Sequence, residues 1–158
     1  MRYFRGAVTA VVVSAMLPTV FATEPSVLNR RSRASSHSGK THYYDRTGKR
    51  VGSSRSTGNR TTYYDRSGRV TGVRRGNQQR TTFTGRNGRT LERSRTSGNR
   101  TSYYDRTGRT AGYSRVQGQR TNFYDRSGRR IGSSRSSNGR TTYYDRSGRI
   151  TGRSHSRK

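Results

Sequence analysis

The chain is poor in the residue types that build an ordinary globular core. It has no cysteine, which excludes a disulfide framework and a thiolate metal site. After removal of the leader expected at the N-terminus, residues 23–158 contain only 11 Leu, Ile, Val and Phe. A chain with less than about a fifth of these residues and a high net charge falls in the composition range of disordered proteins. The sequence therefore does not favour a conventional apolar core.

Acidic residues are equally scarce. There are 7 Asp and Glu against 35 Lys and Arg, so the formal net charge is +28. A chain this basic repels itself unless counter-charge is near. Its expected partners are therefore polyanions: lipopolysaccharide, acidic polysaccharide or nucleic acid, with contact to an anionic membrane surface as a further option. Arg outnumbers Lys, which favours bidentate contacts with phosphate or carboxylate groups. The sequence leaves the ligand and the oligomeric state open.

The N-terminus has the pattern of a secretory signal peptide over residues 1–22. Two arginines give it a positive start, an apolar run covers residues 7–17, and Val20 and Ala22 place residues of small or modest size at the two positions that a signal peptidase reads. This run is shorter than the ~20 apolar residues of a membrane-spanning helix. We expect a helical signal peptide, cleaved after Ala22, and a secreted or periplasmic protein. Residues 23–40 are rich in Ser and Arg without periodicity, which predicts a disordered basic linker.

A unit of twenty residues repeats from Thr41 to the end of the chain. The six units are 41–60, 61–80, 81–100, 101–120, 121–140 and a truncated 141–158. Positions are counted from 1 to 20 within a unit, so Thr41 is at position 1. A fixed period of this length indicates a repeat array in which each unit contacts its neighbours.

Each unit carries the signals of a β-hairpin. The sixth reads Tyr-Tyr-Asp-Arg-Ser-Gly at 143–148; Asp suits the start of a type I turn, and Gly can adopt φ > 0 after it. This combination is a common three-residue hairpin loop. The turn-forming glycines are Gly48, Gly68, Gly88, Gly108, Gly128 and Gly148. A second turn, such as the Gly-Asn pair at 58–59, closes each unit.

The flanks of the first turn favour strands because they are rich in Thr and aromatic residues. With a three-residue loop, Asp145 would face Arg149 and Tyr143 would face Thr151. We therefore expect an all-β fold, in which tandem β-hairpins of period 20 form an antiparallel meander or a solenoid-like sheet. Short strands with Arg on both faces give no apolar band for lipid, which argues against a transmembrane barrel.

The third unit departs from this pattern. Thr84-Gly85 replaces the Tyr-Asp pair, and Glu92 replaces the Gly found at position 12 of the other units. The turn signal survives as Asn87-Gly88. If one unit frays first, we expect it to be this one.

The repeated Tyr-Asp pair with Gly three residues later resembles the tyrosine–aspartate (YD) repeat of Rhs-type bacterial proteins. The matching pairs are Tyr44-Asp45, Tyr64-Asp65, Tyr104-Asp105, Tyr124-Asp125 and Tyr144-Asp145. The resemblance covers roughly three quarters of the chain and implies β-hairpin repeats that coil into a long sheet. The chain also looks like the small, signal-peptide-bearing repeat proteins of Gram-negative bacteria, for which the resemblance implies no established activity.

Binding is the only function that the residues indicate. Arginines interleaved with aromatic residues are typical of surfaces that hold phosphates while bases stack, and such a surface equally suits a sugar polymer. The candidate polyanion-binding residues are Arg46, Arg60, Arg66, Arg80, Arg106, Arg120, Arg126, Arg140 and Arg146. The aromatic residues expected to pack the sheet or to stack on a ligand are Tyr43, Tyr63, Phe83, Tyr103, Phe123 and Tyr143.

Catalysis and metal binding have little support. The three histidines, His37, His42 and His155, are scattered, and the acidic residues come singly, mostly one per turn, so neither a triad nor a ligand cluster is indicated. We expect no enzyme, no cofactor and no metal site. Two alternatives to polyanion binding stay open. One is a structural or accessory repeat segment without a specific ligand, and the other is a disordered cationic chain that folds only on a partner.

Overall fold

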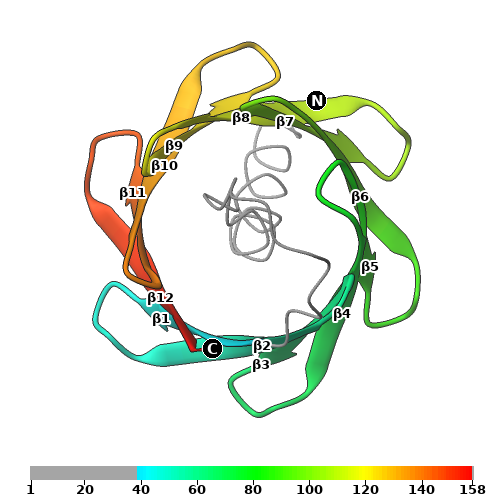
Figure 1. Ribbon diagram of the computed structural model, residues 1–158, viewed down its shortest axis with the longest axis vertical. Coiled ribbons are helices and arrows are strands. Elements are labelled where there is room, and N and C mark those ends of the chain that lie inside the picture. The colour runs from blue at the N-terminus through cyan, green and yellow to red at the C-terminus, as the bar shows by residue number, and fades with distance from the viewer. Residues whose placement is uncertain (1–38, 158) are drawn as a thin grey trace, which may run out of the picture.

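The computed structural model describes residues 39–157, which form a closed barrel of twelve antiparallel strands (Figure 1). The strands are β1 Gly39–Asp45, β2 Arg50–Thr57, β3 Arg60–Asp65, β4 Val70–Gly76, β5 Arg80–Gly85, β6 Thr90–Ser97, β7 Arg100–Asp105, β8 Thr110–Gln117, β9 Arg120–Asp125, β10 Arg130–Ser137, β11 Arg140–Asp145 and β12 Ile150–Arg157. The expected signal peptide and residues 23–38 of the expected linker lie outside the described residues. No helix in the described part of the chain is long and apolar enough to cross a membrane.

The all-β class and the tandem antiparallel hairpins, paired in sequence order, are confirmed, but the sheet closes into a barrel and does not form a solenoid. β1 pairs with β2 on one side and with β12 on the other, so the last unit meets the first. The Thr41 and Ser156 hydroxyls lie 3.1 Å apart across this junction. Strand twist accumulates around a sheet, and closure leaves no strand edge unpaired. β1 begins at Gly39, so residues 39 and 40 belong to a strand and not to a disordered linker.

The first turn of each hairpin has the expected geometry. In the fifth unit, the Gly128 amide donates to the Asp125 carbonyl at 3.1 Å, and the Asp125 amide donates to the Arg129 carbonyl at 3.0 Å. Gly128 has φ +82°. Asp125 Oδ1 accepts hydrogen bonds from Ser127 Oγ at 2.6 Å and from the amides of Ser127 at 2.9 Å and Arg129 at 3.0 Å. The hydrogen bond from the Ser127 hydroxyl is the main cause that lowers the pKa of Asp125.

The register beyond this turn differs from the expectation by one residue. Tyr143 faces Gly152 and not Thr151, because a β-bulge lies between Tyr143 and Tyr144 in their pairing with β12. The same irregularity occurs in all six hairpins. A one-residue shift moves side chains to the opposite face of a strand. The bulge therefore decides which residues of the return strand point into the barrel.

The interior is built from aromatic rings and hydroxyl groups. The aromatic residue at position 3 of every unit is buried, with at most 9% of its surface exposed. Tyr43 donates to or accepts from Ser54, with their hydroxyl oxygens 2.7 Å apart. The rings of Tyr63 and Phe83 meet edge to face with centroids 5.6 Å apart. The barrel thus packs around large aromatic side chains, which compensate for the scarcity of aliphatic residues.

Glycine at position 12 is required by a close approach between neighbouring hairpins. A Cβ atom added at Gly112 would lie 2.4 Å from the carbonyl oxygen of Tyr124. A Cβ atom added at Gly52, Gly132 or Gly152 would lie 2.6–2.7 Å from the equivalent tyrosine carbonyl oxygen. The exception is Glu92, whose side chain is buried in the interior.

Candidate functional site

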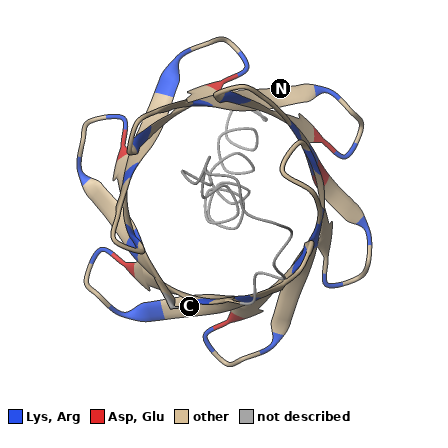
Figure 2. Ribbon diagram, in the orientation of Figure 1, with Lys and Arg blue, Asp and Glu red and all other residues tan. Residues whose placement is uncertain are grey.

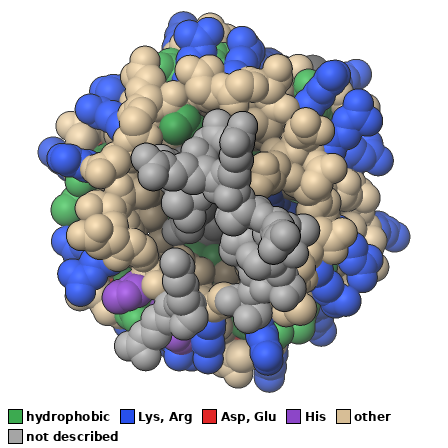
Figure 3. Space-filling model, in the orientation of Figure 1, with side chains coloured by type: hydrophobic (Ala, Val, Ile, Leu, Met, Phe, Trp, Pro, Cys, Tyr) green, Lys and Arg blue, Asp and Glu red, His purple; other side chains and the backbone are tan. Residues whose placement is uncertain are grey.

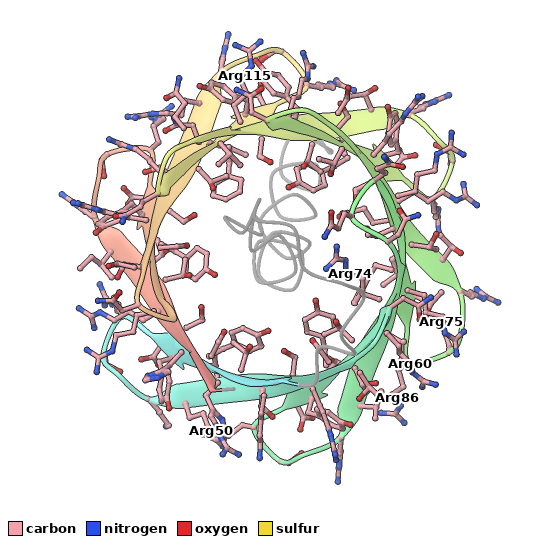
Figure 4. The ribbon with its side chains drawn as sticks, in the orientation of Figure 1. Arg50, Arg60, Arg74, Arg75, Arg86 and Arg115 are labelled. Atoms are coloured by element: carbon pink, nitrogen blue, oxygen red, sulfur yellow. The ribbon has the colours of Figure 1, made fainter. Side chains whose placement is uncertain are left out.

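The outer wall of the barrel carries two regularly repeated sets of arginines. Successive side chains alternate between the two faces of a strand, so the residues next to the buried position 3 and position 14 point outward. Arginines occupy position 15 of the first five units and position 20 of every complete unit. All of these arginines are exposed. Figure 4 shows Arg60, Arg75 and Arg115 on the outside of the ring, and Figure 3 shows Lys and Arg around the perimeter of one face.

Basic side chains face one another directly across the strands of each hairpin. The facing pairs are Lys40–Arg55, Arg60–Arg75, Arg80–Arg95, Arg100–Arg115, Arg120–Arg135 and Arg140–His155. Like charges directly opposite in a sheet destabilise it. Because this unfavourable pairing of Lys or Arg recurs in five of the six hairpins, hairpin stability does not explain it.

Each facing pair also lies diagonally across from the facing pair of the next hairpin. Arg75 faces Thr82, which is two residues from Arg80 on the same strand. Diagonal neighbours of this kind are about 7–8 Å apart, within reach of long side chains. At the junction of the barrel, His155 faces His42, which is two residues from Lys40. The pairs therefore join into a closed ring around the outer wall.

We call this ring the cationic belt. It consists of Lys40, Arg55, Arg60, Arg75, Arg80, Arg95, Arg100, Arg115, Arg120, Arg135, Arg140 and His155. The acidic residues between 39 and 157 lie elsewhere, five as Asp in the first turns and one as the buried Glu92. The aspartates accept hydrogen bonds from their own turns, as Asp45 does from Thr47 and Lys49. The belt therefore contains eleven Lys or Arg residues and one His, without an acidic residue among them.

The nine arginines predicted from the sequence fall into two separate groups. Arg60, Arg80, Arg120 and Arg140 lie in the cationic belt, at the strand ends next to the second turns. Arg46, Arg66, Arg106, Arg126 and Arg146 lie in the first turns and are exposed. These first turns connect the strands at the opposite ends, and Figure 2 shows their loops splayed outward with Lys and Arg along them and Asp at their base. The structure therefore does not bring the two groups into one site.

The belt arginines at position 15 were missed from the sequence. With the register expected there, Arg140 would face Ser154, and position 15 would lie on the opposite face. The bulge shifts the pairing so that Arg140 faces His155. No residue type in the return strand marks this bulge, although the recurrence of Arg every twenty residues was a signal that position 15 has a role.

The aromatic residues also divide between the two faces. The position-3 rings, expected to pack or to stack on a ligand, all lie inside the barrel (Figure 4). The tyrosines at position 4 lie on the outer wall and are half-buried: Tyr44, Tyr64, Tyr104, Tyr124 and Tyr144. These outer tyrosines are the ones that a surface ligand can reach.

One aromatic cluster breaks the symmetry of the outer wall. Tyr113, at a position occupied by Ser, Val or Arg in the other units, faces Tyr124. Their rings are stacked with centroids 4.7 Å apart and planes at 12°. The guanidinium carbon of Arg100 lies 4.1 Å from the centroid of Tyr113, and that of Arg115 lies 5.7 Å from it.

A second irregularity lies inside the barrel. Arg74 replaces the serine found at position 14 of the other units and points inward (Figure 4). Arg74 and Glu92 both face Phe83, from the strands on its two sides. Burial raises the pKa of Glu92 to about 8, and the positive charge of Arg74 offsets part of this rise. The two departures thus place a guanidinium group and a carboxyl group, whose pKa is raised by burial, in the same part of the interior.

Comparisons with family models, with curated proteins and with solved structures find no match to this chain.

Proposed function

We propose that this protein is a secreted or periplasmic, non-enzymatic repeat protein that binds polyanions at the cell envelope. The observation that supports this function most strongly is the cationic belt, in which arginines face one another around the outer wall. A linear polyanion laid along the belt meets Lys or Arg at eleven of its twelve residues, at alternating direct and diagonal spacings. Binding would release the counterions of the polyanion, which is the main source of affinity in such complexes.

The energetics of the belt support a bound anion. A phosphate, sulfate or carboxylate group placed between Arg60 and Arg75 would turn a repulsive pair into two attractive contacts. Arginine is suited to this role because its planar fork binds such groups in a bidentate manner. The half-buried tyrosines at position 4 add flat surfaces on the same wall, on which sugar rings or bases can pack. Lipopolysaccharide, acidic polysaccharide and nucleic acid are therefore the ligands proposed.

A location outside the cytoplasm is proposed from the leader at residues 1–22 and from the likeness to YD repeats. The outward arginines support an aqueous setting for the barrel, because charged side chains on a lipid-facing wall are costly. Mass spectrometry of the exported protein tests this proposal: an N-terminus at Thr23 is expected. An intact Met1 in the soluble periplasmic fraction would contradict it.

Binding is tested with a panel of polyanions across a salt series. The panel contains single-stranded DNA, duplex DNA, lipopolysaccharide and an acidic polysaccharide. We expect binding at low salt and retention of one ligand at about 0.3 M salt, because contacts beyond counterion release survive screening. If no polyanion binds at low salt, the proposal fails, and a structural or accessory role without a specific ligand takes its place.

A further inference from the structure

One facing pair of the cationic belt has surroundings that the others lack. Arg100 on β7 faces Arg115 on β8, and the ring of Tyr113 lies beside both guanidinium groups, 4.1 Å and 5.7 Å from their central carbons. Tyr124 on β9 stacks on the same ring at 4.7 Å. Since β7 and β9 flank β8 on opposite sides, Arg100 and Tyr124 cover opposite faces of Tyr113.

This arrangement restrains the arginines without consuming their hydrogen-bond donors. A guanidinium that lies flat on an aromatic ring is attracted by the electrons of the ring face. Its N–H groups point outward in its own plane, so they stay available for a bidentate contact. An arginine that is already held in place loses less rotamer freedom when an anion binds. The other pairs of the belt have no aromatic residue at position 13, where Ser53, Val73, Arg93, Ser133 and Arg153 stand.

We infer that the Arg100–Arg115 pair is the primary anion site of the barrel and takes a tetrahedral oxyanion, the phosphate or sulfate group of a polyanion. This inference rests on the proposed function, because it ranks the pairs of a belt that binds polyanions. Tyr113 is the positioning residue: it holds the two guanidinium groups and is itself supported by Tyr124. The other five facing pairs bind the same groups more weakly and extend the contact around the wall.

The test is a site-resolved titration of the ¹⁵N-labelled protein, followed by NMR at the side-chain Nε–H groups of the arginines. Inorganic phosphate and inorganic sulfate are titrated separately, which distinguishes the two sources of the oxyanion. We expect Arg100 and Arg115 to saturate at a concentration roughly 3- to 10-fold lower than Arg120 and Arg135, the range that pre-ordering of one or two side chains gives. If all facing pairs saturate together, the inference is overturned.

Two substitutions separate positioning by Tyr113 from general effects on the fold. Tyr113→Ser introduces the residue present at position 13 of the first and fifth units, so it is compatible with the repeat. With this substitution, Arg100 and Arg115 should saturate at the same anion concentration as the other pairs. The matched control is Val73→Ser, the introduction of the same residue at position 13 of the second unit, where Val73 faces Thr84. The control should leave the titration of Arg100 and Arg115 unchanged.

The reciprocal substitution should create a second site. Ser133 faces Tyr144 just as Tyr113 faces Tyr124, and Arg120 donates to the Ser133 hydroxyl at 3.5 Å. Ser133→Tyr should therefore strengthen anion binding at Arg120 and Arg135 several-fold. If Ser133→Tyr does not strengthen binding and Tyr113→Ser has no effect, Tyr113 does not position the arginines. This conclusion would hold even if the salt series shows that polyanions bind. A salt series without binding would instead refute the proposed function itself.

Discussion

Glu92 is the residue whose environment departs furthest from the repeat. Its side chain is 8% exposed at a position where the other five units have glycine. Removal of the carboxylate from water raises its pKa to about 8 from 4.5, although the charge of Arg74 acts in the opposite direction. Nearby, burial also raises the pKa of the Tyr63 hydroxyl, which lies in the same part of the interior. The stability of the barrel should therefore depend on pH through Glu92.

The sign of that dependence follows from the raised pKa. Between pH 4.5 and about 8 the unfolded chain has lost the proton of Glu92, whereas the folded barrel keeps it. Stability from this group is therefore complete at acidic pH and declines as the pH rises to about 8. Glu92→Gln removes the titration, so the free energy of unfolding of the variant relative to the native chain should increase by a few kcal/mol from pH 5 to pH 8. Urea titrations at the two pH values measure it, and an unchanged difference would show that Glu92 is ionised in the folded protein.

At the scale of the hairpin, the glycine at position 12 and the bulge beside it act together. The bulge places position 12 opposite the aromatic residue of position 3, as Gly112 lies opposite Tyr103. The backbone of the next hairpin then approaches so closely that a Cβ atom at Gly112 has no space. This contact fixes neighbouring hairpins to one another, and it is independent of the turns.

Gly112→Ala should therefore destabilise the barrel. Its methyl group would lie 2.4 Å from the Tyr124 carbonyl oxygen, and relief of such a clash by backbone movement costs about 1–3 kcal/mol. The matched control is Gly118→Asn, at a turn glycine with φ +57° and no atom within 4 Å of an added Cβ. Asn138 occupies the equivalent position with φ 49°, so the control should lose much less stability. Thermal unfolding of both variants measures these losses of stability. Equal losses in the two variants would contradict the close approach at Gly112.

The sequence is informative about hairpins but not about the bulge between them. The spacing of Asp and Gly predicts the first turn because it prescribes backbone angles within a few residues. The bulge depends on how the return strand packs against its neighbours, and no local residue pattern marks it. As a result, the expected partner of Tyr143 was wrong by one residue, and the belt arginines at position 15 were missed. The arginines named at positions 6 and 20 are exposed but lie on two different surfaces, and Arg100 at position 20 was not among them.

At the scale of the whole molecule, closure of the sheet joins the six hairpins into one barrel. The repeat predicts how one unit contacts the next, but the number of units that completes a ring depends on the twist accumulated between them. The sequence therefore did not predict that β12 would return to β1. Closure also makes the cationic belt continuous, because His155 faces His42, which is two residues from Lys40 on the same strand.

A disulfide across the junction tests closure. The chain has no cysteine, so Thr41→Cys with Ser156→Cys introduces a single pair at two residues that face each other, with hydroxyls 3.1 Å apart. The pair should oxidise readily and stabilise the barrel by about 2–4 kcal/mol, since it closes a long loop. Thr41→Cys with Ser114→Cys joins strands that are not neighbours and should stay reduced. Reduced thiols in the first variant under oxidising conditions would mean an open sheet.

The most direct test of the account compares the cationic belt with the turn arginines at equal charge. One variant replaces Arg75, Arg95 and Arg135 of the belt with Gln, and the other replaces Arg66, Arg86 and Arg126 of the first turns. Both remove three exposed positive charges from the wall or the loops of the same barrel. The measurement is the affinity of each variant for the tightest-binding polyanion of the panel as a function of salt. The belt variant should lose at least about ten-fold more affinity than the turn variant and show a shallower salt dependence. Equal losses in the two variants would mean that the charge acts generically, and the belt would not be the binding surface.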